Sequence, residues 1–163
     1  MKCSTENSHQ VVRRMGRAFS LTSESLGYFL GYTLVHADKV AFVSPWVSDV
    51  SLRLPVTDSV ENRHPSLVEA VTQLDTVVTF VIQTGQEHNA SVCEQLPDTV
   101  TVLEVDDLHA KVVVCDEFAY VGSANITHGG LSLNRELCNV VENEYRDVDT
   151  YLETELDITL DST

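Results

Sequence analysis

Four polar side chains that could hold and attack a phosphate lie close together in the sequence, at His109, Lys111, Ser123 and Asn125. An imidazole is a nucleophile, an ammonium group neutralises negative charge, and a hydroxyl and an amide donate hydrogen bonds to oxygen. Lys111, Ser123 and Asn125 are therefore candidates to hold the non-bridging oxygens of a phosphodiester while His109 attacks phosphorus. The simpler alternative is a hairpin whose polar residues have no shared function.

Two runs of β-branched residues flank a short polar turn between these side chains, which predicts a β-hairpin. Residues two apart on a strand share a face, so His109 and Lys111 point the same way. With the turn centred on Glu117, His109 lies opposite Asn125. In the same register Lys111 lies opposite Ser123, with Cβ atoms about 4.5–5.5 Å apart. One face of the hairpin is then expected to gather all four side chains.

The string from His109 to Asn125 resembles the signature of the phospholipase D superfamily, H-x-K-(x)4-D-(x)6-G-S-x-x-N or a near variant. The matching residues, in chain order, are His109, Lys111, Asp116, Gly122, Ser123 and Asn125. Downstream, Asn134-Arg135-Glu136 is similar to the family's N-x-E element. The chain departs from the pattern in two places: five residues separate the aspartate from the glycine, and the asparagine follows the serine by two. The resemblance covers about residues 22–145.

This resemblance implies a phosphodiesterase that uses no metal and no cofactor. His109 would form a phosphohistidine, a second histidine would protonate the leaving oxygen, and water would resolve the adduct. Lys111 is both catalytic and phosphate-binding in this scheme, and the carboxylate of Glu136 orients the nucleophile. Asp116 and Gly122 are expected to be structural. A metal cluster of the two preceding aspartates with His109 is a weaker alternative, because the motif already accounts for the histidine.

Most members of the superfamily carry two such motifs in one long chain, whereas this sequence carries one. Its other histidines lack the context of a second motif: His9, His36, His64, His88 and His128. The resemblance therefore predicts a C2 homodimer whose active site lies across the two-fold axis and uses His109 of both subunits.

Short single-motif members of the family are usually nuclease-like, while lipid-acting members usually have two motifs and membrane segments. We therefore expect a DNA (or RNA) phosphodiester substrate, in defence, restriction, modification or repair. A component of DNA 7-deazapurine modification clusters is one specific candidate. A lipid phosphodiesterase or phosphatidyl transferase is the second hypothesis, and a catalytically idle dimer that binds nucleic acid is the third.

Helical and strand patterns alternate over the first two thirds of the chain. Helices are predicted over residues 22–37, 65–74 and 86–95, and strands over 39–44, 76–83 and 100–105. This order predicts the α/β class, as a phospholipase-D-like α/β/α sandwich with a mixed sheet flanked by helices. An amphipathic helix is predicted within residues 147–161. The aromatic residues Tyr28, Phe29, Tyr32 and Trp46 are expected to belong to the core.

One phosphodiesterase domain is predicted over residues 21–163, preceded by a flexible basic arm over 1–20. The arm has four basic residues and one acidic residue, and a short helix from Val11 to Phe19 is expected in it. Neither a signal peptide nor a run of about 20 apolar residues is visible, so we expect a cytoplasmic protein without a membrane segment.

The formal charge of −15 arises from 25 acidic and only 10 basic residues, of which three are lysines. This composition is typical of proteins from halophilic organisms, and an ordinary acidic cytosolic protein is the alternative. At about 1 M salt the Debye length falls to about 3 Å, so the acidity does not exclude a phosphate-bearing substrate. A helicase or modification-system partner is a candidate for delivering nucleic acid to so negative a protein.

Overall fold

The structure, a computed structural model, describes residues 18–21, 23–58 and 60–160. Most of the predicted basic arm, residues 1–17, lies outside the described residues. Where the predictions and the structure overlap, Ala18–Leu21 forms strand β1 rather than the end of a helix that reaches Phe19. The sheet therefore begins before the predicted domain boundary at residue 21, because β1 pairs with a strand near the other end of the chain.

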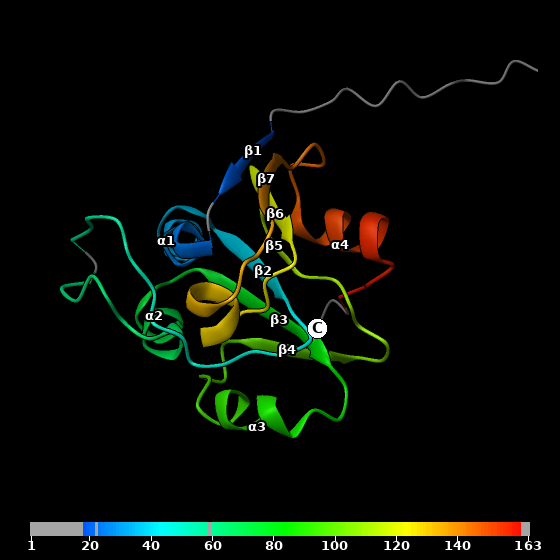
Figure 1. Ribbon diagram of the computed structural model, residues 1–163, viewed down its shortest axis with the longest axis horizontal. Coiled ribbons are helices and arrows are strands. Elements are labelled where there is room, and N and C mark those ends of the chain that lie inside the picture. Colours follow the sequence, from blue (N-terminus) through cyan, green and yellow to red (C-terminus); the bar gives the residue numbers. More distant parts are fainter. Residues whose placement is uncertain (1–17, 22, 59, 161–163) are drawn as a thin grey trace, which may run out of the picture.

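A seven-stranded sheet forms the centre of the described fold, in the order β1-β7-β6-β5-β2-β3-β4 (Figure 1). The other strands are β2 Lys39–Val43, β3 Val77–Gln83, β4 Thr101–Val105, β5 Val112–Cys115, β6 Phe118–Gly122 and β7 Cys138–Glu142. The helices are α1 Ser23–His36, α2 Leu67–Gln73, α3 Glu87–Cys93, the π-helix η1 Gly129–Leu133, and α4 Val148–Leu156. All six helices and strands predicted over residues 22–105 are confirmed, with shifts of a few residues at their ends.

The sheet contains both parallel and antiparallel strand pairs, and these strand directions determine at which edge the loops converge. Strands β2, β3 and β4 run parallel to one another, whereas β5 runs antiparallel to β2 and pairs with it through Val43 and Val112. The carboxyl ends of the three parallel strands therefore lie at the same edge as the beginning of β5. Because β6 is antiparallel to β5, the end of β6 reaches this edge as well.

Two apolar layers cover the two faces of the sheet. Along β2, Val40 and Phe42 belong to the core shared with α1, α2 and α3, while Ala41 and Val43 belong to the core shared with α4. This alternation is what a strand with helices on both faces requires. Figure 1 shows α1 and α2 on one side of the sheet and α4 on the other. The predicted α/β/α sandwich is confirmed.

The register of the β5–β6 hairpin differs by one residue from the prediction. Val113 pairs with Tyr120, and the N–H of Gly122 donates to the carbonyl oxygen of Lys111 at 3.3 Å. The turn consists of two residues rather than three, because Phe118 already belongs to β6 and packs against the core. Lys111 therefore lies opposite Gly122, and Ser123 is not its cross-strand neighbour.

The turn of this hairpin is held by a buried asparagine, Asn143, which directly follows β7. The backbone N–H of Asn143 donates to the carbonyl of Glu117 at 2.8 Å, and its side-chain amide donates to the carbonyl of Cys115 at 2.8 Å. A fully buried amide that satisfies both ends of a turn stabilises that turn length over a longer one. These two hydrogen bonds favour the two-residue turn, and a turn one residue shorter than predicted shifts the β5–β6 register by one residue.

Three elements were not predicted, namely β1, β7 and η1. Within the described residues no helix combines the length and the apolar character needed to cross a lipid bilayer.

Candidate active site

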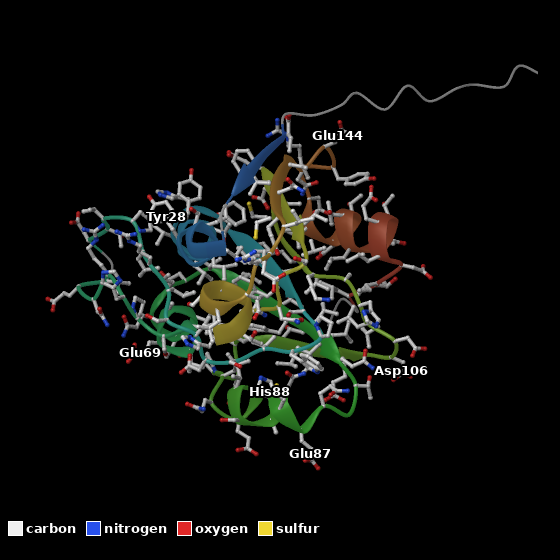
Figure 2. All side chains as sticks on the ribbon, in the orientation of Figure 1. Tyr28, Glu69, Glu87, His88, Asp106 and Glu144 are labelled. Atoms are coloured by element: carbon white, nitrogen blue, oxygen red, sulfur yellow. The ribbon has the colours of Figure 1, made fainter. Side chains whose placement is uncertain are left out.

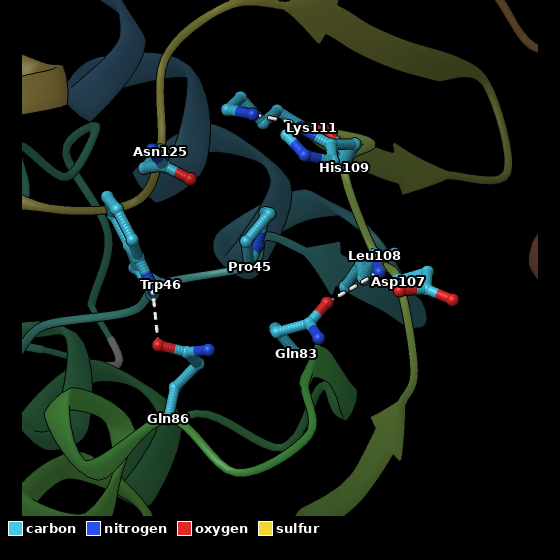
Figure 3. A pocket seen from close by; sticks show the side chains of 9 residues that line it. All are labelled: Pro45, Trp46, Gln83, Gln86, Asp107, Leu108, His109, Lys111 and Asn125. Carbon is cyan, nitrogen blue, oxygen red and sulfur yellow. Dashed lines mark hydrogen bonds between the residues drawn. The ribbon is translucent and has the colours of Figure 1, made fainter.

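A pocket of about 390 Å³ lies at the edge of the sheet where the loops converge (Figure 3). Its lining residues are Pro45, Trp46, Gln83, Gln86, Asp107, Leu108, His109, Lys111 and Asn125. The site thus combines three of the side chains predicted to handle a phosphate, those of His109, Lys111 and Asn125, with six further residues. Ligands commonly bind outside the carboxyl ends of parallel strands, which is where this pocket lies.

Each wall of the pocket comes from the end of a strand. Pro45 and Trp46 follow β2, Gln83 ends β3, and the segment 107–111 connects β4 to β5. Asn125 follows the end of β6. The mixed sheet brings these segments together even though they are separated by as many as 80 residues in the chain.

The hairpin prediction placed His109 and Lys111 on a strand. In the structure both residues precede β5, which begins at Val112. His109 is exposed and Lys111 is half-buried. The Nζ of Lys111 donates to the carbonyl oxygen of His109 at 3.0 Å, which fixes the ammonium group beside the histidine (Figure 3). The two residues therefore reach one pocket through a local backbone contact and not through strand alternation.

Asn125 is held by a buried serine that the sequence did not single out. The Oγ of Ser44, which is fully buried, accepts from the N–H of Ile126 at 3.1 Å and lies 3.3 Å from the Oδ1 of Asn125. The same hydroxyl donates to the carbonyl of Trp46 at 2.7 Å. One side chain thereby links two walls of the pocket.

Tyr120 supports the segment just before Asn125 from the core. Its hydroxyl accepts from the N–H of Ala124 at 3.1 Å, and the tyrosine side chain is buried. Burial raises the pKa of Tyr120 well above the usual value for a tyrosine. The hydroxyl therefore stays protonated throughout the physiological pH range and keeps its hydrogen bonds with the backbone of Ala124.

Gly130 of η1 allows a close approach that positions the same segment. A Cβ atom at Gly130 would lie 2.1 Å from the carbonyl oxygen of Asn125, a distance that only glycine avoids. A π-helix turn is often found at functional sites.

Ser123 and Glu136 form a pair next to the pocket and do not line it. The hydroxyl of Ser123 donates to the carboxylate of Glu136 and accepts from the N–H of Leu137 at 2.9 Å. Among the described residues, Glu136 has its hydrogen bond with Ser123 and none with His109. The resemblance had implied that Glu136 orients the histidine. That contact is not made in this single chain.

Gly122 and Asp116 lie where the motif implied structural residues. A Cβ at Gly122 would lie 2.2 Å from the carbonyl oxygen of Leu137, so the strand pairing beside the site needs a glycine there. Asp116 occupies the hairpin turn and lines a separate pocket of about 380 Å³ with residues of α1 such as His36. It is therefore far from His109 along β5, at the opposite end of the strand.

Within the described part of the chain, no group of three or more histidine, cysteine, aspartate or glutamate side chains is arranged to share a metal ion. The cluster of Asp106, Asp107 and His109 that the sequence left as an alternative is not formed.

Trp46 corrects one expectation about the aromatic residues. Its side chain is 48% exposed and lines the pocket, whereas the sequence assigned it to the core. Tyr28 and Tyr32 of α1 are likewise exposed, and only Phe29 is buried. Helical spacing cannot separate a buried aromatic from one at the margin of the apolar face, and Trp46 lies in a loop where no periodicity applies.

Several solved structures share this fold. A phospholipase D family member, Nuc from Salmonella typhimurium, is 15% identical with a TM-score of 0.60, covering 86% of this chain and 91% of that one. NucT from Helicobacter pylori is 14% identical with a TM-score of 0.53, covering 86% and 90%. Polyphosphate kinase from Porphyromonas gingivalis is 13% identical with a TM-score of 0.58, covering 90% of this chain and 24% of that one. At these identities the likeness establishes the fold.

The sequence comparisons add the family. No curated protein sequence matches the chain. A family model described as cardiolipin synthase, PLD-like domain, matches residues 67–157, which is more than half of the chain and includes the whole segment from His109 to Glu136. With its sheet order, its pocket and this match, the chain belongs to the phospholipase-D-like domain family.

Proposed function

We propose that this protein is a metal-independent phosphodiesterase that cleaves DNA through a phosphohistidine formed at His109. The observation that carries the proposal is the meeting of His109, Lys111 and Asn125 in one pocket at the sheet edge. A nucleophile, a cation and an amide in one concave site are the groups that an attack on a phosphodiester requires.

The charge state of the lysines supports a phosphate at this position. Lys39 is neutralised by Asp149, whose two carboxylate oxygens lie 2.6 and 2.7 Å from its Nζ. Lys111 contacts a neutral carbonyl oxygen instead. Among the described residues it is therefore the lysine whose charge has no carboxylate partner, and a phosphate oxygen would supply one.

The proposed reaction has two displacements. A ring nitrogen of His109 attacks phosphorus, and the bond to the leaving oxygen breaks as the partner subunit's His109 donates a proton to that oxygen. Water then gives a proton back to the same histidine and attacks phosphorus, which breaks the P–N bond and releases a phosphomonoester. Lys111 and Asn125 hold the non-bridging oxygens, where negative charge accumulates.

A second histidine is needed, and among the described residues no histidine other than His109 lines the pocket. His36 and His64 line other pockets, and His88 is hydrogen-bonded to Ser48 at 2.8 Å. We therefore propose a C2 homodimer in which the two copies of His109 face each other across one site. Ser123 and Glu136 remain candidates for phosphate binding and for orienting the histidine.

Phosphatidyl transfer is the second candidate function, because the matching family model bears the name of a cardiolipin synthase. The chemistry at phosphorus would be the same, with an alcohol in place of water. A dimer that binds nucleic acid without cutting it is the third. A helicase or modification-system partner stays a proposal for how DNA reaches the site.

The decisive experiment is cleavage of plasmid and single-stranded DNA by the purified chain in molar salt with EDTA. We expect cleavage, and we expect His109→Ala to lower the rate by roughly three orders of magnitude or more, as removal of a nucleophile does. His64→Ala is the matched control, because His64 is also exposed but lines another pocket.

Loss of cleavage on adding EDTA would overturn the metal-independent mechanism, and so would retained activity of the His109→Ala protein. Transfer or release of a phospholipid headgroup, without DNA cleavage, would make phosphatidyl transfer the function. DNA binding with no turnover of either substrate would establish the idle dimer.

A further inference from the structure

The proposed chemistry uses one end of the pocket and leaves the other end without an assigned role. That end is formed by Trp46, Gln83 and Gln86. Figure 3 shows the indole of Trp46 along one side of the pocket, with His109 and Lys111 across from it. A tryptophan that is nearly half exposed contributes less hydrophobic stabilisation to the fold than a buried one. Exposed tryptophans are common at binding surfaces.

Trp46 is exposed but firmly held. Its indole N–H donates to the Oε1 of Gln86 at 3.1 Å, and its carbonyl accepts from Ser44. On either side, the buried amide of Asn89 donates to the carbonyl of Pro45 at 2.9 Å and accepts from the N–H of Val47 at 2.8 Å. The loop is thus fixed from α3, and the indole face is presented to the pocket before any ligand arrives.

Each of the two glutamines beside Trp46 already accepts one hydrogen bond at its amide oxygen, while its NH2 donors are unused among the described residues. The Oε1 of Gln83 accepts from the N–H of Leu108 at 2.5 Å, and the Oε1 of Gln86 is occupied by the indole. Their NH2 groups are left for a ligand, and the nitrogen of Gln86 points across the pocket toward Gln83 (Figure 3). A ligand in this end is therefore expected to present carbonyl oxygens.

Charge divides the pocket into two regions. Lys111 gives one end a positive charge, whereas Trp46, Gln83 and Gln86 give the other end no charge. The group next to the scissile phosphate must then be uncharged, flat enough to stack on an indole, and equipped with acceptors.

We propose that this end of the pocket binds an unpaired nucleobase with carbonyl oxygens, stacked on Trp46 and hydrogen-bonded by Gln83 and Gln86. The inference rests on the proposed function for the identity of the substrate. A base inside a duplex cannot offer its face to Trp46, so the site would require single-stranded nucleic acid. A choline headgroup would also suit the indole of Trp46, but the glutamine NH2 groups have no partner on a trimethylammonium ion.

Trp46 is the sole tryptophan of the chain, so its fluorescence reports on this site directly. The full-length His109→Ala protein is titrated with oligothymidylate, with an oligonucleotide of the same length that lacks bases, with oligoadenylate and with glycerophosphocholine, under red-edge excitation. We expect quenching by oligothymidylate, weaker quenching by oligoadenylate, and none by the abasic strand or by glycerophosphocholine.

Two variants measure the contribution of the contacts. Trp46→Ala is expected to weaken binding of oligothymidylate, followed by a labelled strand, by roughly ten- to a hundred-fold. Gln86→Glu keeps the acceptor for the indole but replaces the donor with a negative oxygen, so it should weaken oligothymidylate binding as well. Tyr28→Ala is the control, because Tyr28 is an exposed aromatic residue on α1 outside this pocket.

The outcomes separate the base site from the catalytic proposal. Cleavage that is unchanged by Trp46→Ala, with no quenching, would overturn the base site and leave the phosphodiesterase intact. Quenching by oligothymidylate without any cleavage by the wild-type protein would support the base site and overturn the nuclease. Quenching by glycerophosphocholine alone, strengthened by Gln86→Glu, would overturn the base site in favour of a choline headgroup.

Discussion

At the scale of single residues, the motif indicated His109, Lys111 and Asn125, which line one pocket, but it did not indicate the residues that hold their loops in place. Ser44, Asn89 and Tyr120 are buried polar residues whose hydrogen bonds fix the loops of the pocket. A sequence read alone gives such residues no distinguishing pattern, because their roles depend on which backbone groups the fold leaves without a partner. His109 and Lys111 could be predicted because the motif is local.

Buried tyrosines make the stability of the fold sensitive to alkali. Burial, together with the nearby Glu155 and Tyr145, raises the pKa of Tyr151 to about 12, and burial also raises the pKa of Tyr120. An unfolded tyrosine titrates near pH ~10. Between these values the folded chain keeps protons that the unfolded chain has lost, so stability is complete below pH ~10 and decreases as the pH rises above it.

We therefore expect the urea midpoint to decrease steeply above pH ~10. Tyr151→Phe keeps the ring but removes the titrating hydroxyl, so its midpoint should decrease less steeply. Parallel curves for the two proteins above pH ~10 would show that Tyr151 does not contribute.

At the scale of elements, the parallel unit from β2 to β4 and the existence of the β5–β6 hairpin were predictable, whereas the register of the hairpin and strand β7 were not. Strands such as Val77–Gln83 are strongly apolar and are separated by helical patterns. The two-residue turn of the hairpin depends on Asn143, which lies far along the chain, and β7 alternates weakly because Val141 and Glu142 are both half-buried. A π-helix has no periodicity that distinguishes Gly129–Leu133 from a loop.

The contact between η1 and the site gives a prediction about Gly130. Gly130→Ala introduces a Cβ that collides with the backbone of Asn125, so we expect a loss of about 1–3 kcal/mol in unfolding free energy and reduced cleavage. Urea unfolding and the DNA assay measure the two effects.

Gly27 provides the matched control, because it lies in α1 and its nearest neighbours are 3.8 Å from the added Cβ. Gly27→Ala should leave cleavage unchanged and stabilise the protein by up to about 1 kcal/mol through helix propensity. A Gly130→Ala protein as stable and active as wild type would show that η1 does not position Asn125.

At the scale of the whole molecule, the acidity belongs to the surface. The labelled acids Glu69, Glu87, Asp106 and Glu144 lie at the periphery on several sides of the fold (Figure 2). The described residues form two ion pairs, Lys39–Asp149 and Arg146–Glu142. Most carboxylates therefore have no basic partner, and their mutual repulsion is weakened by salt. The excess of acidic residues could be read from the composition alone, because the net charge does not depend on how the chain folds.

The proposed shared site makes a prediction about mixed dimers. If one active site needs His109 from both subunits, a dimer with one His109→Ala subunit is inactive. When wild-type and His109→Ala chains are refolded together, activity should decrease with the square of the wild-type fraction. A decrease in simple proportion would indicate independent sites, and a monomeric mass by light scattering of an active sample would exclude the dimer. The sequence of a single chain indicates a shared active site only indirectly, because it carries one motif where most members of the family carry two.

The pairing of β1 with β7 joins the beginning of the chain to its last strand. Phe19 lies opposite Val140, so more than a hundred residues must be synthesised before β1 has a partner. The β2–β3–β4 unit can assemble earlier, because its strands are neighbours in sequence. Contacts of such long range form late and slow the folding of a domain. On the ribosome, closure of this edge of the sheet must therefore wait until β7 has been synthesised.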